Sequence, residues 1–274
     1  MITKNTMMGK KILFINQEIS PYIADNEMSL LGKLFPQKIQ EAGYEIRTFM
    51  PKWGTVNERR GQLHEVQRLS GMNLIIDDTD HPLIIKVASI QSARIQVYFL
   101  DNDDYFPKKH VGENDDIEEE NINGERAVFY ARGVLETVKK LRWVPDLIVC
   151  QGWMSALVPL YIKKAYNEEP SFVNTKIITL LFDNQPKELL EENFRKCIEF
   201  KDIKEDILDN YSKDFDYNEF VNLAIDYSDG VIAASKDLDQ SIKKHLKTKK
   251  IPKLKYQGKD FTDEHKKFIE SFLE

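Results

Sequence analysis

The chain alternates short apolar runs with longer stretches whose apolar residues recur at helical spacing. Residues 11–15 (KILFI) form a β-type run, and residues 29–42 carry apolar positions on one face before Gly43, a residue suited to a left-handed helix cap. A second β-type run follows at residues 45–49. Strand, helix and strand in this order predict a βαβ unit, which requires a parallel sheet and a right-handed crossover.

The pattern changes in the next part of the chain. Short β-type runs at residues 74–76, 83–87 and 94–100 are separated by turn-rich residues, which predicts hairpins at one edge of the sheet. Residues 113–121 are strongly acidic and lack periodicity, so we expect a solvated loop there.

Helical and strand patterns then alternate again. The predicted elements are helix 123–140, strand 146–150, helix 154–166, strand 177–182, a helical region 187–225, a last strand 230–234 and a helix at about 236–246. This alternation specifies an α/β fold with a doubly wound, Rossmann-like, mostly parallel sheet. We predict one domain over residues 1–250 and a C-terminal tail, 251–274, with one short helix.

Composition narrows the classes of function. Hydrophobic residues at 42% and charged residues at 31% are typical of a folded globular chain. A net charge of −6 disfavours nucleic acid as the main partner. Since no apolar run reaches the roughly 20 residues of a membrane span, and the first ten residues are polar, we expect a cytoplasmic protein without a membrane partner. The lysine-rich residues 243–255 fit a solvated helix end and linker, and the alternative is contact with phosphate, RNA or an acidic partner.

The residue types that bind metals and cofactors form no recognisable motif. Cys150 and Cys197 lie far apart without CxxC spacing, which predicts two reduced core thiols. A polar turn contains Asp77, Asp78, Asp80 and His81. Ligands within one short turn rarely complete a coordination shell, so we interpret this turn as a hairpin tip. The sequence also lacks GxGxxG and GxxxxGK[ST], and we expect no metal and no cofactor.

Four segments carry a family resemblance. They are residues 11–22 with their continuation 43–51, residues 97–106 (VYFLDNDDYF), residues 143–159 (WVPDLIVCQGWMSALVP) and residues 227–235 (YSDGVIAAS). In this order they resemble the N-terminal domain of bacterial glycogen synthases and plant starch synthases, which are two-domain glycosyltransferases of the GT-B type. The resemblance implies a single N-terminal-type GT-B domain, and a family activity of glucosyl transfer from ADP- or UDP-glucose to an α-1,4-glucan.

The family's chemical residues are largely replaced. Where the family has a K-T-G-G loop that meets the nucleotide-sugar phosphates, this chain has Ala24, Asp25, Asn26 and Glu27. The family's H-D-W reads Gln151, Gly152 and Trp153, and its I-H-N reads Phe182, Asp183 and Asn184. Carboxylates in place of a lysine and glycines repel a diphosphate. We also find no counterpart of the family's second domain, which carries most of the donor site, and therefore expect a degenerate active site.

Candidate binding residues follow three predicted strands. Glu18 follows the first strand, Gln151 a later one, and Asp183 with Asn184 another. Because open α/β sheets bind ligands at the carboxyl ends of their strands, we predict that Glu18, Gln151 and Asp183 line one cleft. Tyr22 and Trp153 complete the candidate set. Trp153 suits either a face for a sugar or a place in the core.

Three functions remain open from the sequence. The first is a degenerate homologue that binds a glucan, a nucleotide sugar or a protein partner. The second is one half of a split, active hexosyltransferase whose partner chain supplies the second GT-B domain. The third is a regulatory scaffold without a ligand. The sequence does not decide whether the chain is an enzyme.

Overall fold

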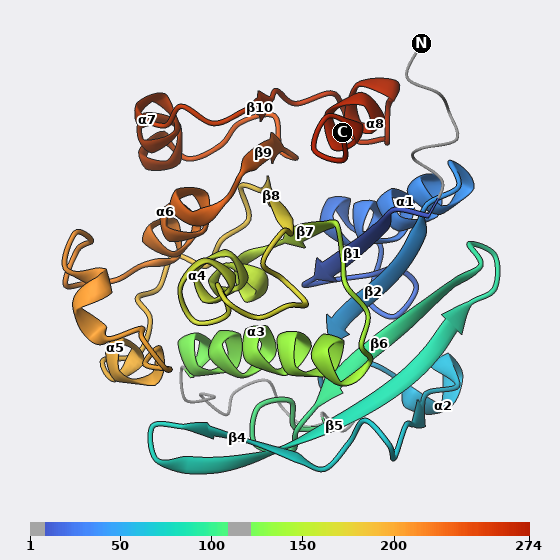
Figure 1. The fold of residues 1–274 in the computed structure, drawn as a ribbon, viewed down its shortest axis with the longest axis horizontal. Coiled ribbons are helices and arrows are strands. Elements are labelled where there is room, and N and C mark those ends of the chain that lie inside the picture. Colours follow the sequence, from blue (N-terminus) through green and yellow to red (C-terminus); the bar gives the residue numbers. More distant parts are fainter. Residues whose placement is uncertain (1–8, 109–121) are drawn as a thin grey trace.

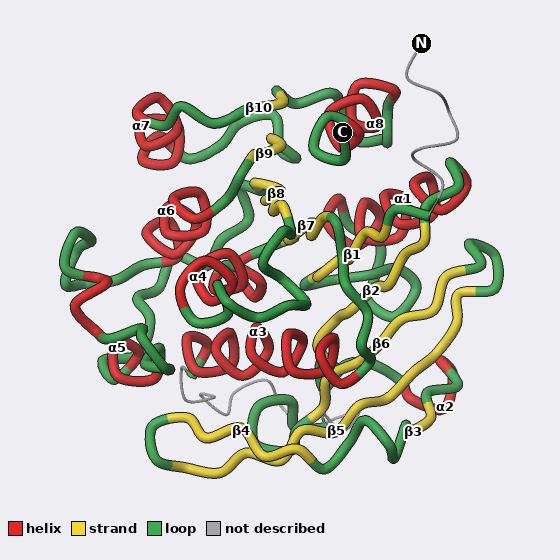
Figure 2. The backbone as a smooth tube through the Cα atoms, viewed as in Figure 1, coloured by secondary structure: helices red, strands yellow, loops and turns green. Residues whose placement is uncertain are grey.

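A computed structural model describes residues 9–108 and 122–274 of the chain, so the predicted loop at 113–121 lies outside the described residues. The described residues form one α/β body built around a twisted central sheet (Figure 1). Helices lie against both faces of this sheet, as the tube drawing also shows (Figure 2).

The sheet is mostly parallel, as predicted. Its strands are β1 (Lys11–Asn16), β2 (Glu45–Pro51), β3 (His64–Glu65), β4 (Met72–Ile76), β5 (Thr79–Ile90), β6 (Ile95–Asp101), β7 (Leu147–Gln151), β8 (Lys176–Leu181), β9 (Gly230–Ala233) and β10 (Lys253–Leu254). The order is β10-β9-β8-β7-β1-β2-β6-β5-β3, with β4 paired to β5. All neighbours from β10 to β6 are parallel, while β5 is antiparallel to β3, β4 and β6. The hairpins predicted at one sheet edge are confirmed.

Strand β1 explains how the sheet is covered on both faces. Successive side chains of a strand point to opposite faces. Leu13 and Ile15 join the larger core cluster, whereas Ile12 and Phe14 join the second cluster. The larger cluster packs α3 (Asn123–Lys140), α4 (Leu157–Lys164) and α6 (Tyr217–Tyr227) against the sheet, and the second packs α1 (Glu27–Glu41) and α8 (Asp263–Glu270). The remaining helices are α2 (Glu58–Gly61), α5 (Phe194–Cys197) and α7 (Gln240–Thr248).

Helix α1 starts with a capping box. The side chain of Asn26 accepts a hydrogen bond from the Ser29 amide at 2.9 Å, and the Ser29 hydroxyl accepts one from the Asn26 amide at 2.9 Å. The helix ends before Gly43, whose φ of +99° is the left-handed conformation that the sequence predicts there.

The helical prediction for residues 187–225 is wrong over most of its length. Within that region the structure contains the four-residue α5, a 3-10 turn at Glu205–Leu208 and α6. Its buried apolar residues are Leu190, Phe194, Cys197, Ile198, Ile203, Leu208, Phe215, Tyr217, Phe220, Val221, Leu223, Ala224 and Ile225. Before α6 these anchors are irregularly spaced, so the chain reaches the core at separate points and presents no continuous helical face.

Residues 251–274 contribute a strand and a helix to the body. Strand β10 pairs in parallel with β9, so the strand predicted as the last one is not the sheet edge. The predicted short helix is α8, whose His265 ring contacts the Phe35 ring of α1 at 5.0 Å. The domain boundary at residue 250 stays a prediction. Among the described helices, none has both the length and the apolarity needed to cross a membrane.

Candidate functional site

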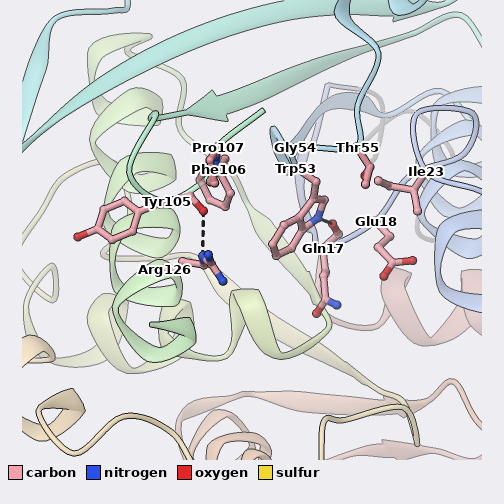
Figure 3. A pocket seen from close by; sticks show the side chains of 10 residues that line it. All are labelled: Gln17, Glu18, Ile23, Trp53, Gly54, Thr55, Tyr105, Phe106, Pro107 and Arg126. Carbon is pink, nitrogen blue, oxygen red and sulfur yellow. Dashed lines mark hydrogen bonds between the residues drawn. The ribbon is translucent and has the colours of Figure 1, made fainter. Parts of the chain in front are cut away.

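The carboxyl ends of β1, β2 and β6 surround a cleft of about 350 Å³, here called the Trp53 cleft (Figure 3). The loops after these strands and the first turns of α3 supply its lining, which is Gln17, Glu18, Ile23, Trp53, Gly54, Thr55, Tyr105, Phe106, Pro107 and Arg126. These strands are neighbours in the sheet, so segments far apart in sequence meet here. Ligand sites of open α/β sheets lie at this edge.

Aromatic rings form the apolar part of the Trp53 cleft. The Trp53 indole Nε1 donates a hydrogen bond to the Gln17 carbonyl at 2.8 Å, which fixes the ring plane. Its ring meets Phe106 edge to face at 5.5 Å between centroids. Behind it lies Trp153, 6.4 Å away, which itself packs edge to face on Tyr217. The exposed part of the Trp53 ring is therefore held by a rigid aromatic layer.

Charged groups of both signs border the same cleft. The Arg126 guanidinium donates from Nε to the Tyr105 carbonyl and from Nη1 to Asn123 Oδ1, each at 2.8 Å. Glu18 Oε2 accepts a hydrogen bond from Asn26 Nδ2 at 2.6 Å. An apolar ring flanked by a carboxylate and a guanidinium suits a ligand that has both apolar faces and hydroxyl groups.

A second cleft of about 500 Å³, here called the Asp183 cleft, lies at the start of α1. Its lining is Asn26, Glu27, Met28, Phe182, Asp183, Asn184, Ser235 and Asp237. Among the described residues this lining has three carboxylates and no Lys or Arg. The amide of Asp183 donates to the Ser235 hydroxyl at 3.1 Å, which ties the loop after β8 to the loop after β9.

Gln151 lies between the two clefts but is buried, with 1% of its surface exposed. Its Nε2 donates to the Met28 carbonyl at 2.9 Å, and its Oε1 accepts from the Glu18 amide at 3.4 Å. Its neighbour Gly152 has φ of +77°, and a Cβ there would lie 2.4 Å from Gln17 Oε1. Both residues therefore connect loops and lie outside the lining of either cleft.

The predicted site residues thus do not share one lining but lie in several places. Glu18 lines the Trp53 cleft, Asp183 and Asn184 line the Asp183 cleft, and Asn26 connects the two through Glu18. Trp153 is 7% exposed and belongs to the core.

Tyr22 contacts the Phe99 ring at 4.8 Å, and burial raises the pKa of its hydroxyl to about 12. Ala24 is exposed on the loop before α1, three residues before Glu27, which lines the Asp183 cleft. The role of these residues in ligand binding stays a prediction.

Sequence reasoning missed most of the Trp53 cleft. Trp53 lies two residues after the segment 43–51, and Tyr105 and Phe106 end the segment 97–106, so all three lie within or beside the resembling motifs. Arg126 carried no comparable signal, because it lies early in an ordinary amphipathic helix.

The described residues hold no cluster of metal-ligating side chains and no disulfide. In residues 9–108 and 122–274, no three His, Cys, Asp or Glu side chains have a metal-binding arrangement. Both cysteines are free and buried, and burial raises the pKa of the Cys197 thiol to about 12.

The mostly parallel sheet and the clefts at its carboxyl edge define a doubly wound α/β domain of the kind found in GT-B folds. The chain belongs to the starch synthase catalytic domain family, whose model matches residues 11–254. It is 36% identical over 171 residues to a glycogen synthase of Chlorobium phaeobacteroides and 38% identical over 171 residues to one of Pelodictyon phaeoclathratiforme. Each match covers 61% of this chain and 35% of the relative, so the chain spans about a third of the length of these relatives.

A solved structure shares the fold. The catalytic domain of starch synthase IV from Arabidopsis thaliana, bound to ADP and acarbose, superposes with a TM-score of 0.70 at 16% identity. The match covers 90% of this chain and 52% of that one. The α/β fold and the family membership inferred from the sequence are thereby confirmed.

Gly32→Ala is expected to destabilise the fold by about 2 kcal/mol, because overpacked cores cost roughly that amount. A Cβ at Gly32 would lie 2.2 Å from the Glu18 carbonyl oxygen, a backbone atom that cannot rotate away. Urea unfolding followed by circular dichroism measures this change. Leu30→Ala on the same helix, where the side chain is 39% exposed, serves as the control and should change stability by less than about 0.5 kcal/mol. Equal stability of both variants would show that α1 can move away from Glu18.

Proposed function

We propose that this chain binds an α-1,4-glucan or a short malto-oligosaccharide in the Trp53 cleft and does not transfer glucose on its own. The observation that carries the proposal is the lining of this cleft, an indole fixed by a 2.8 Å hydrogen bond and bordered by Glu18 and Arg126. Sugar rings present apolar C–H faces to aromatic rings, and their hydroxyls pair with carboxylates and guanidinium groups. The starch synthase IV structure that shares this fold holds acarbose, which supports a carbohydrate ligand.

The start of α1 supports the second half of the proposal. A helix N-terminus binds phosphate when its amides are open and its surroundings are neutral or cationic. Here the Ser29 amide is already bonded to the Asn26 side chain, and Glu27, Asp183 and Asp237 surround the same space. Such a lining repels the diphosphate of ADP-glucose or UDP-glucose.

A second candidate is one half of a split hexosyltransferase. The observation that favours it is the family match over residues 11–254, since the matched relatives are glycogen synthases. In this proposal a partner chain supplies the cations that meet the leaving diphosphate, and the Trp53 cleft holds the glucan acceptor.

A thermal-shift and calorimetry series tests the glucan site that both candidates share. We expect maltoheptaose to raise the melting temperature, because a ligand of the native state stabilises it by mass action, and we expect ADP and ADP-glucose to leave it unchanged. The purified chain is also expected to transfer no glucose from ADP-glucose or UDP-glucose to glycogen. If ADP-glucose raised the melting temperature and maltoheptaose did not, the chain would have a nucleotide-sugar site and no glucan site, and the proposal would be wrong. An unchanged melting temperature with every ligand would favour the ligand-free scaffold.

A further inference from the structure

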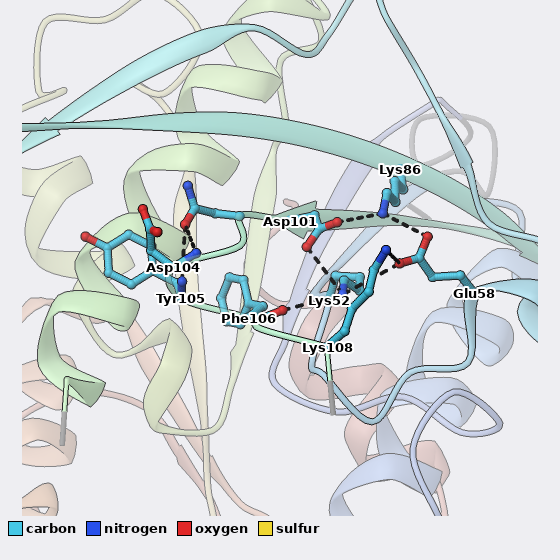
Figure 4. Close-up of polar contacts among 9 residues, drawn as sticks. Lys52, Glu58, Lys86, Asp101, Asp104, Tyr105, Phe106 and Lys108 are labelled. Carbon is cyan, nitrogen blue, oxygen red and sulfur yellow. Dashed lines mark hydrogen bonds and ion pairs between the residues drawn. The ribbon is translucent and has the colours of Figure 1, made fainter. Parts of the chain in front are cut away.

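A buried lysine, Lys52, contacts Asp101, Glu58 and the backbone of Phe106, a residue that lines the Trp53 cleft (Figure 4). Lys52 follows the last residue of β2, and only 1% of its surface is exposed. Its ammonium lies 3.5 Å from Asp101 Oδ1, 3.7 Å from Glu58 Oε1 and 3.5 Å from the Phe106 carbonyl oxygen. Charged lysines are rarely buried to this degree unless they are paired.

Lys86 binds the same two carboxylates more closely. Its ammonium lies 2.6 Å from Asp101 Oδ2 and 2.8 Å from Glu58 Oε2. Burial disfavours the charged form of Glu58, but the hydrogen bond from Lys86 and the nearby lysine charges outweigh it, so the pKa of Glu58 lies below its usual value. Both carboxylates are thus held by Lys86, whereas the oxygens that face Lys52 receive no hydrogen bond from any described residue.

Lys52 differs from Lys86 in what else it reaches. The residue after Lys52 is Trp53, whose indole forms one wall of the cleft. The carbonyl that Lys52 contacts belongs to Phe106, whose ring meets Trp53 edge to face at 5.5 Å. Lys86 lies on β5, outside the cleft lining. One ammonium therefore connects the loop after β2 to the loop after β6, and these loops carry the two aromatic walls.

We propose that Lys52 is a positioning residue that sets the separation of Trp53 and Phe106 and so controls carbohydrate affinity. The proposal rests on the carbohydrate-binding function argued above. Lys52 itself does not line the cleft, so it acts through the two loops that it connects. A cleft whose walls shift by a fraction of an ångström loses simultaneous contact with both faces of a sugar ring.

Two matched variants of the full chain test this role. Lys52→Met and Lys86→Met each remove one ammonium from the same carboxylates, so both should lower the melting temperature. By calorimetry with maltoheptaose, we expect Lys52→Met to raise Kd about tenfold and Lys86→Met to raise it less than about threefold. If Lys52→Met does not fold, Lys52→Met combined with Glu58→Gln removes the uncompensated carboxylate and takes its place.

A spectroscopic signal separates positioning from general destabilisation. The indole N–H of Trp53, assigned by its loss in Trp53→Phe, should shift in the ¹H–¹⁵N spectrum of Lys52→Met and stay in place in Lys86→Met. An unshifted indole in Lys52→Met, or equal losses of affinity in both lysine variants, would overturn the proposal. Failure of the wild type to bind maltoheptaose would instead reject the carbohydrate function, and the indole shift would still report whether Lys52 positions the wall.

Discussion

Trp53→Ala is expected to weaken maltoheptaose binding by at least about 2 kcal/mol, roughly thirtyfold in Kd, because buried tryptophans dominate the energy of binding sites. The variant removes the apolar face of the cleft and the 2.8 Å hydrogen bond to the Gln17 carbonyl. Trp53→Phe keeps an apolar face but loses that hydrogen bond, so its affinity should fall between those of alanine and wild type. Isothermal calorimetry on the three proteins measures the series.

Trp143→Phe provides the control for this series. Trp143 is buried and lies away from the cleft, where its Nε1 donates a hydrogen bond to Glu45 Oε1. Replacing Trp143 should leave the maltoheptaose affinity unchanged, although it lowers the total tryptophan fluorescence. If Trp53→Ala kept wild-type affinity and a native circular dichroism spectrum, the sugar would have to bind elsewhere, and the assignment of the Trp53 cleft would be wrong.

The sheet was predictable because its strands carry their own signal. The run KILFI at residues 11–15 is apolar at nearly every position, as expected of a parallel strand that is buried on both faces. The loops that form the Trp53 cleft have no such periodicity. Trp53 and Phe106 meet only because β2 and β6 are neighbours in the sheet, and this pairing is not visible in either segment alone.

Gln151 shows why position at a strand end does not settle a role in binding. It is the last residue of β7, at the predicted edge, but alternation along the strand places it on the same face as Leu147 and Val149. That face packs against α1, so the amide of Gln151 bonds to the Met28 carbonyl inside the protein. The sequence correctly predicted that Gln151 lies at the carboxyl end of a strand. The direction of its side chain depends on strand register and on the position of α1.

The loop before α1 can be given back the residue types that favour a phosphate. Ala24→Lys, Asn26→Gly and Glu27→Gly together are expected to raise ADP affinity by at least about tenfold, since each step favours an anion at the helix start. Ala24→Lys adds an ammonium, and Glu27→Gly removes a carboxylate from the Asp183 cleft. Asn26→Gly removes the side chain that caps the Ser29 amide, at a cost of a few tenths of a kcal/mol in stability. Calorimetry with ADP at two salt concentrations measures the gain, which should shrink as salt screens the new charge.

A second triple variant separates the charge from the freed amide. Ala24→Lys, Asn26→Ser and Glu27→Gly makes the same change in charge, but serine still caps the helix and keeps the Ser29 amide occupied. We expect this variant to gain less ADP affinity than the glycine variant, because attraction without open amides lacks the directed hydrogen bonds of a phosphate site. Equal gains in both variants would mean that charge alone excludes the diphosphate. Equal ADP affinity in the wild type and both variants would mean that the start of α1 does not face a nucleotide site, and the correspondence with the family's phosphate loop would be wrong at its first residue.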